Sequence, residues 1–278
     1  MRRLARQLSA ALVVVAISLA CRTVLAEEFR VFTVVYDLSA KQKPGEKPPV
    51  VARAATLFHA GKVYDYVDAA NEVIVLEPTE RRFRVLNPAR GLVATVAFDE
   101  IKTRLNIARE ETRRHAATLT GSDPRSANAA ASLAFQLDPR FEETFNPADG
   151  TLTLDGGPLA YMVRTADPKR PGVPSEYLDY ADWVCQLNYL LHPGPVLPEP
   201  RMALNRSLRA KDRLPETVEL KCVSGHAMHL RAEHAIYFDL NPQEEGWIYQ
   251  WESQLKSEST RQVPMQEYQK IVLATRAR

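Results

Sequence analysis

The sequence predicts an α+β fold: a curved, mainly antiparallel β-sheet, half-barrel-like in shape and covered by several helices. Three observations predict this class. Segments rich in β-branched and aromatic residues follow one another over residues 28–97 and are separated by short polar turns. Amphipathic helical segments then occur between further groups of strands. The regular strand–helix alternation that produces a parallel sheet is missing from the sequence.

The first 26 residues have the composition of a secretory signal peptide. Arg2, Arg3 and Arg6 precede an apolar run over residues 8–21, and Val24-Leu25-Ala26 then offers the pattern of a cleavage site. We therefore expect cleavage after Ala26, which leaves residues 27–278 as a single α+β domain. A lipid anchor on Cys21 is the alternative, but the order Ser18-Leu19-Ala20-Cys21 departs from the usual lipoprotein pattern, so cleavage after Ala26 is favoured.

The charge of the mature chain argues against two classes of partner. Removing residues 1–26 leaves 32 basic and 34 acidic residues, a formal charge of −2. Nucleic-acid binding and attraction to anionic lipid both depend on an excess of basic side chains, so neither is expected. No later segment is apolar for long enough to span a bilayer. The sequence thus predicts an exported protein, periplasmic or extracellular, whose mature form does not span a membrane.

Six strands are expected in the first half of the mature chain, and short turns make them antiparallel neighbours in a meander. They are Phe29–Leu38, Val50–His59, Lys62–Asp68, Val73–Leu76, Arg81–Leu86 and Leu92–Ala97. The Ala60-Gly61 pair predicts a tight hairpin between the second and the third. Phe29–Leu38 and Val73–Leu76 are apolar on both sides, so helices or a bound apolar molecule must cover both of their faces.

The second half is expected to alternate between helices and strands. A helix capped by Asp99 carries an apolar stripe through Ile101 and Leu105. The helices expected after it are Ala127–Leu137, Glu176–Leu191 capped by Ser175, Arg201–Arg213 and Val263–Arg278. The strands are Glu142–Asn146, Leu152–Asp155, Leu159–Thr165 and a final hairpin of Thr217–Val223 with His229–Leu240.

Residues that carry chemistry do not form a convincing catalytic or metal site. His226, His229, Glu233 and His234 are competent metal ligands, but on a strand His229 points away from the face that His226 and His234 share. We therefore predict no metal site and no cofactor. The nucleophile elbow of hydrolases and the glycine-rich phosphate loops are absent from the sequence.

Two cysteines remain after the expected cleavage, Cys185 and Cys222. In an exported protein an even pair is a candidate disulfide. The alternative is two buried thiols that act as small apolar side chains. Both alternatives stay open at the level of the sequence.

Aromatic residues carried on strands are the best candidates for a binding surface. On a concave sheet they would hold an apolar ligand such as a lipid or acyl chain, and ordinary core packing is the alternative. The candidate ligand-binding residues are Phe32, Tyr36, Phe58, Tyr64, Tyr66, Tyr161 and Phe238. Phe58, Tyr64 and Tyr66 are expected to form one patch across the Ala60-Gly61 hairpin.

This layout resembles that of the periplasmic lipoprotein carriers. The resemblance is carried by the export signal, the meander, the hairpin over 151–165 and the strands around Leu214–Leu220 and Ala235–Phe238. It implies a curved antiparallel sheet, an incomplete barrel, with helices filling the hollow. The segments Thr56–Tyr66 and Tyr180-Ala181-Asp182-Trp183 resemble uncharacterised exported bacterial proteins, which implies export and no activity.

The function expected from these observations is non-catalytic binding of an apolar ligand, or of a partner protein, on the curved sheet. A scaffolding protein of the cell envelope without a ligand is the first alternative. A hydrolase that uses His229 or His234 with a carboxylate is the second.

Overall fold

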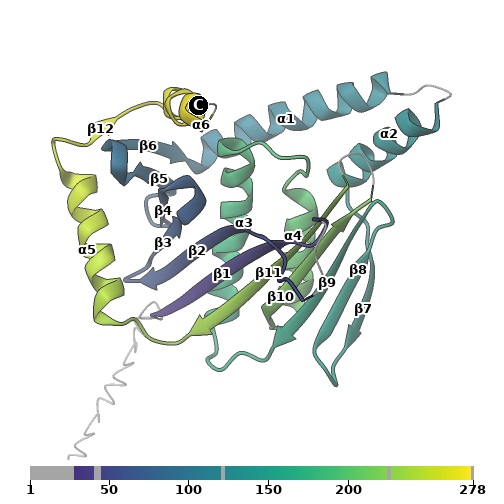
Figure 1. Ribbon diagram of the computed structural model, residues 1–278, viewed down its shortest axis with the longest axis horizontal. Helices are drawn as coiled ribbons and strands as arrows, with labels where there is room; N and C mark the ends of the chain where they lie inside the picture. Colours follow the sequence, from purple (N-terminus) through teal and green to yellow (C-terminus); the bar gives the residue numbers. More distant parts are fainter. Residues whose placement is uncertain (1–27, 41–44, 120–122, 224–226, 277–278) are drawn as a thin grey trace, which may run out of the picture.

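The computed structural model describes residues 28–40, 45–119, 123–223 and 227–276. Within these residues, twelve strands form one sheet in the order β12-β6-β5-β4-β3-β2-β1-β11-β10-β9-β8-β7. All the neighbouring strands are antiparallel except β12 and β6. Because β12 and β7 are free edges, the sheet curves without closing into a barrel (Figure 1). The predicted α+β fold with a curved, mainly antiparallel sheet is confirmed. The predicted signal peptide, residues 1–26 with Cys21, lies outside the described residues.

The meander is confirmed in the first half of the chain. Its strands are β1 (Phe29–Asp37), β2 (Val50–His59), β3 (Lys62–Val67), β4 (Glu72–Glu77), β5 (Arg82–Asn87) and β6 (Leu92–Ala97). Each of them pairs with the next along the chain. β4 is buried along its whole length, as expected for a strand that is apolar on both faces.

The centre of the sheet joins the two ends of the chain. β1 pairs on one side with β2 and on the other with β11 (Met228–Tyr237), about two hundred residues later, as in the pair Thr33 and His234. β10 (Leu214–Cys222) links β11 to β9 (Leu159–Ala166), so the predicted final hairpin is inserted between β1 and β9. β7 (Glu142–Asn146) and β8 (Thr151–Asp155) complete that side.

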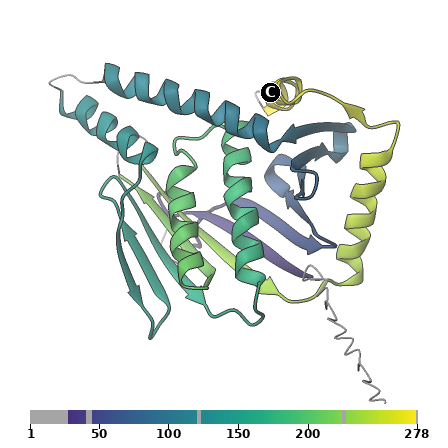
Figure 2. The ribbon, with the colours of Figure 1, turned by 180° about the vertical axis from the view of Figure 1, so that it is seen from behind.

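Four helices cover one face of the sheet. They lie behind the sheet in Figure 1 and in front of it in Figure 2. They are α1 (Phe98–Thr118), α2 (Pro124–Leu137), α3 (Val173–Leu191) and α4 (Glu199–Ala210). Buried residues of α1, α3 and α4 join strand residues in the main hydrophobic core, for example Leu105, Leu178 and Leu204. We call this the helix-covered face. α6 (Met265–Arg276) lies beside β6 and adds Tyr268 to the same core.

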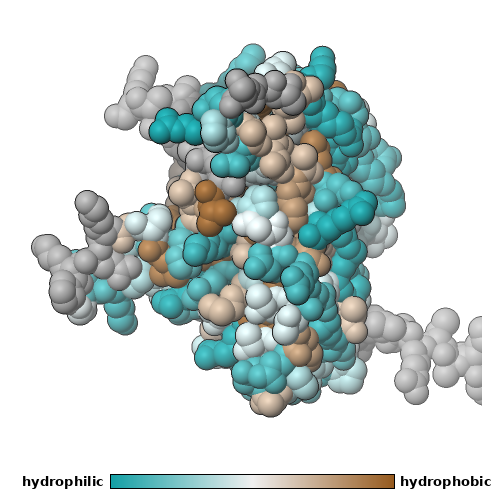
Figure 3. Space-filling model, turned by 90° about the vertical axis from the view of Figure 1, so that its right-hand side faces the viewer, coloured by the Kyte–Doolittle hydropathy of each residue, from teal (hydrophilic) through white to brown (hydrophobic). Residues whose placement is uncertain are grey.

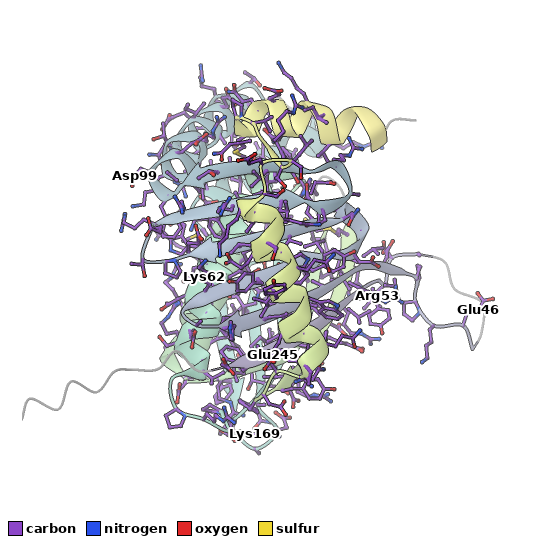
Figure 4. All side chains as sticks on the ribbon, turned by 90° about the vertical axis from the view of Figure 1, so that its left-hand side faces the viewer. Glu46, Arg53, Lys62, Asp99, Lys169 and Glu245 are labelled. Carbon is purple, nitrogen blue, oxygen red and sulfur yellow. The ribbon has the colours of Figure 1, made fainter. Side chains whose placement is uncertain are left out.

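The other face of the meander is covered by α5 (Pro242–Lys256), which crosses the strands in Figure 4 with Lys62 at its flank. Ile248, Trp251 and Leu255 of α5 pack on buried residues of β2 to β6 and form a second core. Lys62 bridges Glu77 and Glu252 at 3.1 and 2.7 Å, which ties the helix to β3 and β4. Each face of the meander therefore has its own hydrophobic core.

Some of the predicted elements differ from the structure. α5 is not among the predicted helices, and it begins where Asn241 and Glu244 form a capping box and Pro242 takes the first helical position. Ser175 does not cap α3, which begins at Val173 after Gly172, whose φ of 90° few other residues adopt. The Arg201–Arg213 segment is helical only over α4, and β12 (Arg261–Gln262) was not predicted.

Among the described residues, none of the helices combines the length and the apolar character needed to cross a membrane.

Candidate functional site

A large hollow lies between the helix-covered face and the α3–α4 connection. It has a volume of about 710 Å³. One wall is formed by β1, β2, β4, β10 and β11, through Val35, Ala52, Ile74, Val218, Leu220 and Ala232. The opposite wall is formed by the end of α3, the loop of residues 192–198 and the first turn of α4. We call this space the cavity.

The apolar wall follows from strand alternation. Residues that alternate along a strand share a face, and the pairing places Val35 opposite both Ala52 and Ala232, and Ala232 opposite Val218. Since Ala52 and Ala232 are small, they leave space between the sheet and α3. Val51 also lines the cavity and is 48% exposed, so this side is open to solvent. The result is an accessible hollow with mostly apolar walls.

A polar cluster closes one part of the lining. Glu72 of β4 is only 1% exposed, and its Oε2 lies 2.7 Å from His192 Nε2. Tyr268 of α6 donates its hydroxyl to the other carboxylate oxygen at 3.0 Å. His192 follows the last residue of α3, where Pro193 and Pro195 prevent the helix from continuing. Both oxygens of Glu72 are therefore engaged by protein groups.

Arg201 of α4 supplies a cation to the cavity lining. Its Nε donates to Asn205 Oδ1 at 2.9 Å, and its guanidinium donates to the hydroxyl of Tyr177. The guanidinium lies deep in the protein, yet Arg201 keeps some accessible surface because it borders the hollow. Among the described residues, no carboxylate forms an ion pair with Arg201. The acids on nearby helices are already paired, Glu199 with Arg109 and Asp182 with Arg209.

The other titratable groups around Arg201 are neutral at physiological pH. Burial raises the pKa of the Tyr161 and Tyr177 hydroxyls. Burial also raises the pKa of the Cys185 thiol to about 12. Burial, and then the charge of Arg201, lower the pKa of His234 to about 3. Arg201 thus carries the one formal charge in this group of five side chains.

A second buried polar cluster lies under α3 and has a structural character. Asp65 of β3 accepts the hydroxyl of Thr56 at 2.8 Å and that of Tyr180 at 2.6 Å. Burial raises the pKa of this carboxyl, although both hydrogen bonds act in the opposite direction. Phe58 packs edge to face with Tyr180 and stacks on Phe29 at 3.8 Å, so the surroundings are tightly filled. This cluster fixes α3 on the sheet.

Of the seven candidate ligand-binding residues, Tyr161 lines the cavity. Phe58 lies on the helix-covered face but is completely buried in the main core. Phe32 and Tyr36 lie on the other side of β1, where Phe32 meets the ring of Tyr237 and Tyr36 meets Arg231. Phe238 follows β11 and lies under the cations of Lys169 and Arg170.

Tyr64 and Tyr66 do not share a patch with Phe58. The two turn residues Ala60 and Gly61 have φ of 50° and 74°, typical of a type I′ turn, and this turn pairs Phe58 with Val63 and Leu57 with Tyr64. In this register an even-numbered residue of β2 shares its face with odd-numbered residues of β3. Tyr64 and Tyr66 consequently lie under α5, where both stack near Trp251.

The histidines and cysteines do not form a reactive centre in the described residues. His229 and His234 lie on opposite faces of β11, with His229 near Glu219 and His234 hydrogen-bonded to Thr33 at 2.9 Å. His226 lies outside the described residues, and within them no group of three His, Cys, Asp or Glu side chains is placed to hold a metal. Cys185 and Cys222 are thiols, so the candidate disulfide is not formed in this structure.

Several cavity residues were missed by the sequence reasoning, most importantly Arg201, His192 and Glu72. A local signal for Arg201 does exist. Arg201, Leu204, Asn205 and Leu208 follow the helical spacing of one face, and the last three are fully buried. An arginine on that stripe points inward. The loop of residues 192–198, by contrast, carries no pattern that places it over the sheet.

Comparison with known proteins adds no assignment. No protein-family model matches the chain, and no curated protein matches it either.

Proposed function

We propose that this chain is an exported, non-catalytic protein that binds an apolar ligand, a lipid or acyl chain, in the cavity between the curved sheet and the α3–α4 connection. The observation that carries the proposal is the cavity itself. Its volume of about 710 Å³ is within the roughly 300–1,000 Å³ range of small-molecule sites, and its walls are mostly apolar. The export part rests on the composition of residues 1–26.

The size of the cavity suits a single acyl chain. An apolar cavity of roughly 150 Å³ accommodates benzene, which has six carbon atoms. The cavity of about 710 Å³ therefore has room for on the order of 25 non-hydrogen atoms. A chain of about sixteen carbons with a small head group fits this limit.

The face of the molecule seen in Figure 3 favours a cavity ligand over a docked partner protein. On the face seen in Figure 3, hydrophobic residues occur in small groups separated by hydrophilic ones. A stable partner interface is marked by a larger continuous apolar patch.

Native mass spectrometry of the protein, gently purified after expression with its first 26 residues, tests the proposal. We expect the mass of a mature chain that begins at Glu27, together with the added mass of a bound molecule that organic solvent extracts as a lipid. Binding of the neutral fluorescent probe N-phenyl-1-naphthylamine gives a second measurement. A protein that carries no extractable lipid and takes up no probe would contradict the proposal and favour a scaffolding role.

A matched pair of variants tests whether the probe binds in the cavity. Ala232→Trp fills the space, whereas Ala235→Trp adds the same side chain on the opposite, exposed face of β11. Probe binding should be lost in the first variant and kept in the second. Equal binding by both variants would place the probe elsewhere.

A further inference from the structure

We infer that the ligand of the cavity is a long-chain carboxylate whose head group pairs with Arg201. This inference rests on the proposed function and specifies the chemistry of the ligand. Arg201 lines the cavity without a carboxylate partner among the described residues, and the titratable side chains of Tyr161, Tyr177, Cys185 and His234 around it are neutral.

A half-buried guanidinium without a carboxylate partner is unusual in a folded protein. Arginine stays protonated at all physiological pH values, so it cannot escape the loss of hydration by releasing a proton. Charged side chains are almost never buried unless they are paired. The neighbouring arginines do have carboxylate partners: Arg209 pairs with Asp182 and Asp179, and Arg109 pairs with Glu199. Within the described ranges, the acceptors of Arg201 are the neutral side chains of Asn205 and Tyr177.

The donors of Arg201 fit a carboxylate. A guanidinium has five N–H groups, and the contacts with Asn205 and Tyr177 leave others available at the cavity. The planar fork of the guanidinium matches the two oxygens of a carboxylate, which can accept in a bidentate manner. The apolar side chains of the sheet wall, among them Val218, Leu220 and Ala232, would then contact the hydrocarbon chain.

The single guanidinium of the lining limits the head group to one negative charge. Glu72 contributes a carboxyl group to the lining, and its two oxygens already contact His192 and Tyr268. A carboxyl group held in this way offers no hydrogen-bond donor to a second anionic oxygen. A single guanidinium balances a monoanion, so a carboxylate suits the site better than a phosphate monoester, which carries close to two charges.

Displacement of N-phenyl-1-naphthylamine tests the inference with three ligands of equal chain length: hexadecanoate, hexadecan-1-ol and hexadecyl phosphate. With the unmodified protein, we expect hexadecanoate to displace the probe at a concentration about tenfold or more below that of hexadecan-1-ol, since hydrogen bonds to a charged group contribute most to affinity. Equal displacement by the acid and the alcohol would overturn the inference while leaving the proposed function intact. Tighter binding of hexadecyl phosphate would overturn the assignment to a carboxylate.

Arg201→Met is the decisive variant, and Arg206→Met is its control on the exposed side of the same helix. Methionine keeps an unbranched apolar stem and removes the charge, a replacement that proteins often tolerate at buried ionic sites. We expect Arg201→Met to lose about 30-fold or more in affinity for hexadecanoate and to keep its affinity for hexadecan-1-ol. Hexadecanoate binding as tight as in Arg206→Met would contradict the inference. If Arg201→Met does not fold, the comparison of acid and alcohol on the unmodified protein decides alone. Failure of the probe itself to bind would instead contradict the proposed function.

Discussion

Acidification should destabilise the protein through His234. The imidazole lies among Thr33 of β1, Tyr177 of α3 and the guanidinium of Arg201, and its Nε2 is shielded from solvent with no hydrogen-bond partner in the described residues. Burial, with a further contribution from Arg201, lowers its pKa from 6.5 to about 3. The unfolded chain binds a proton near pH 6.5 that the folded protein does not accept. Stability therefore falls as the pH drops below 6.5 and becomes level again below about pH 3.

The size of the effect follows from the difference between the two pKa values. Each unit of pH between them changes the free energy of unfolding by about 1.4 kcal/mol. Between pH 7 and pH 5 the contribution of His234 is about 2 kcal/mol, and its full range down to pH 3 is about 5 kcal/mol. The first value is a large part of the 5–15 kcal/mol typical of a folded domain, so it is measurable.

Urea unfolding at pH 7, 6 and 5 provides the assay, and His234→Asn provides the comparison. Asparagine can still bond the hydroxyl of Thr33 but does not titrate. The variant should be less stable than the unmodified protein at pH 7, and the gap should narrow by about 2 kcal/mol at pH 5. His115→Asn changes an exposed imidazole on α1 and should run parallel to the unmodified protein. A gap between His234→Asn and the unmodified protein that stays constant from pH 7 to pH 5 would refute the reasoning.

Two further predictions concern the packing of helices on the sheet. Tyr180→Phe removes the donor to buried Asp65 and should lower the free energy of unfolding by about 1–3 kcal/mol in urea, because a buried acceptor is left short of a partner; a change within about 0.5 kcal/mol would show that the contact contributes little. Trp251→Ala should cost about 3–5 kcal/mol, because Trp251 is 7% exposed and fills the second core, whereas Tyr249→Ala, 77% exposed on the same helix, should stay within about 0.5 kcal/mol. Similar losses in both α5 variants would show that burial does not set the cost.

Local patterns were enough to predict most of the elements. The hairpin signal at Ala60-Gly61 and the short turns of the meander place strands correctly, because pairing of neighbours along the chain depends on short-range geometry. α5 was missed because Trp247, Tyr249 and Trp251 favour strands by propensity. Its capping box and its packing on Tyr64 outweigh that preference.

The cavity was harder to predict because it depends on contacts between distant segments. Val35 and Ala232 share a wall only because β11 pairs with β1, which nothing local indicates. Tyr161 was predicted because aromatic residues on strands favour a concave surface. Phe58 was misassigned together with Tyr64 and Tyr66, since a two-residue turn places residues of opposite parity on one face. The helical spacing of Arg201 places it on the buried side of α4. It was missed because a charged residue is normally assigned to the exposed side of a helix.

The position of β1 has a consequence for how the chain becomes a folded protein. Its second neighbour, β11, is made only after about two hundred further residues, and α5, which covers the meander, comes later still. During synthesis from the N-terminus, the meander would therefore present an unpaired strand edge and an uncovered apolar face. Contacts of such long sequence separation slow folding, and exposed strand edges favour aggregation. The amino-terminal half of the chain thus depends on its last fifty residues for protection, so a chaperone or prompt completion of the chain matters more here than in a protein whose strands pair as they emerge.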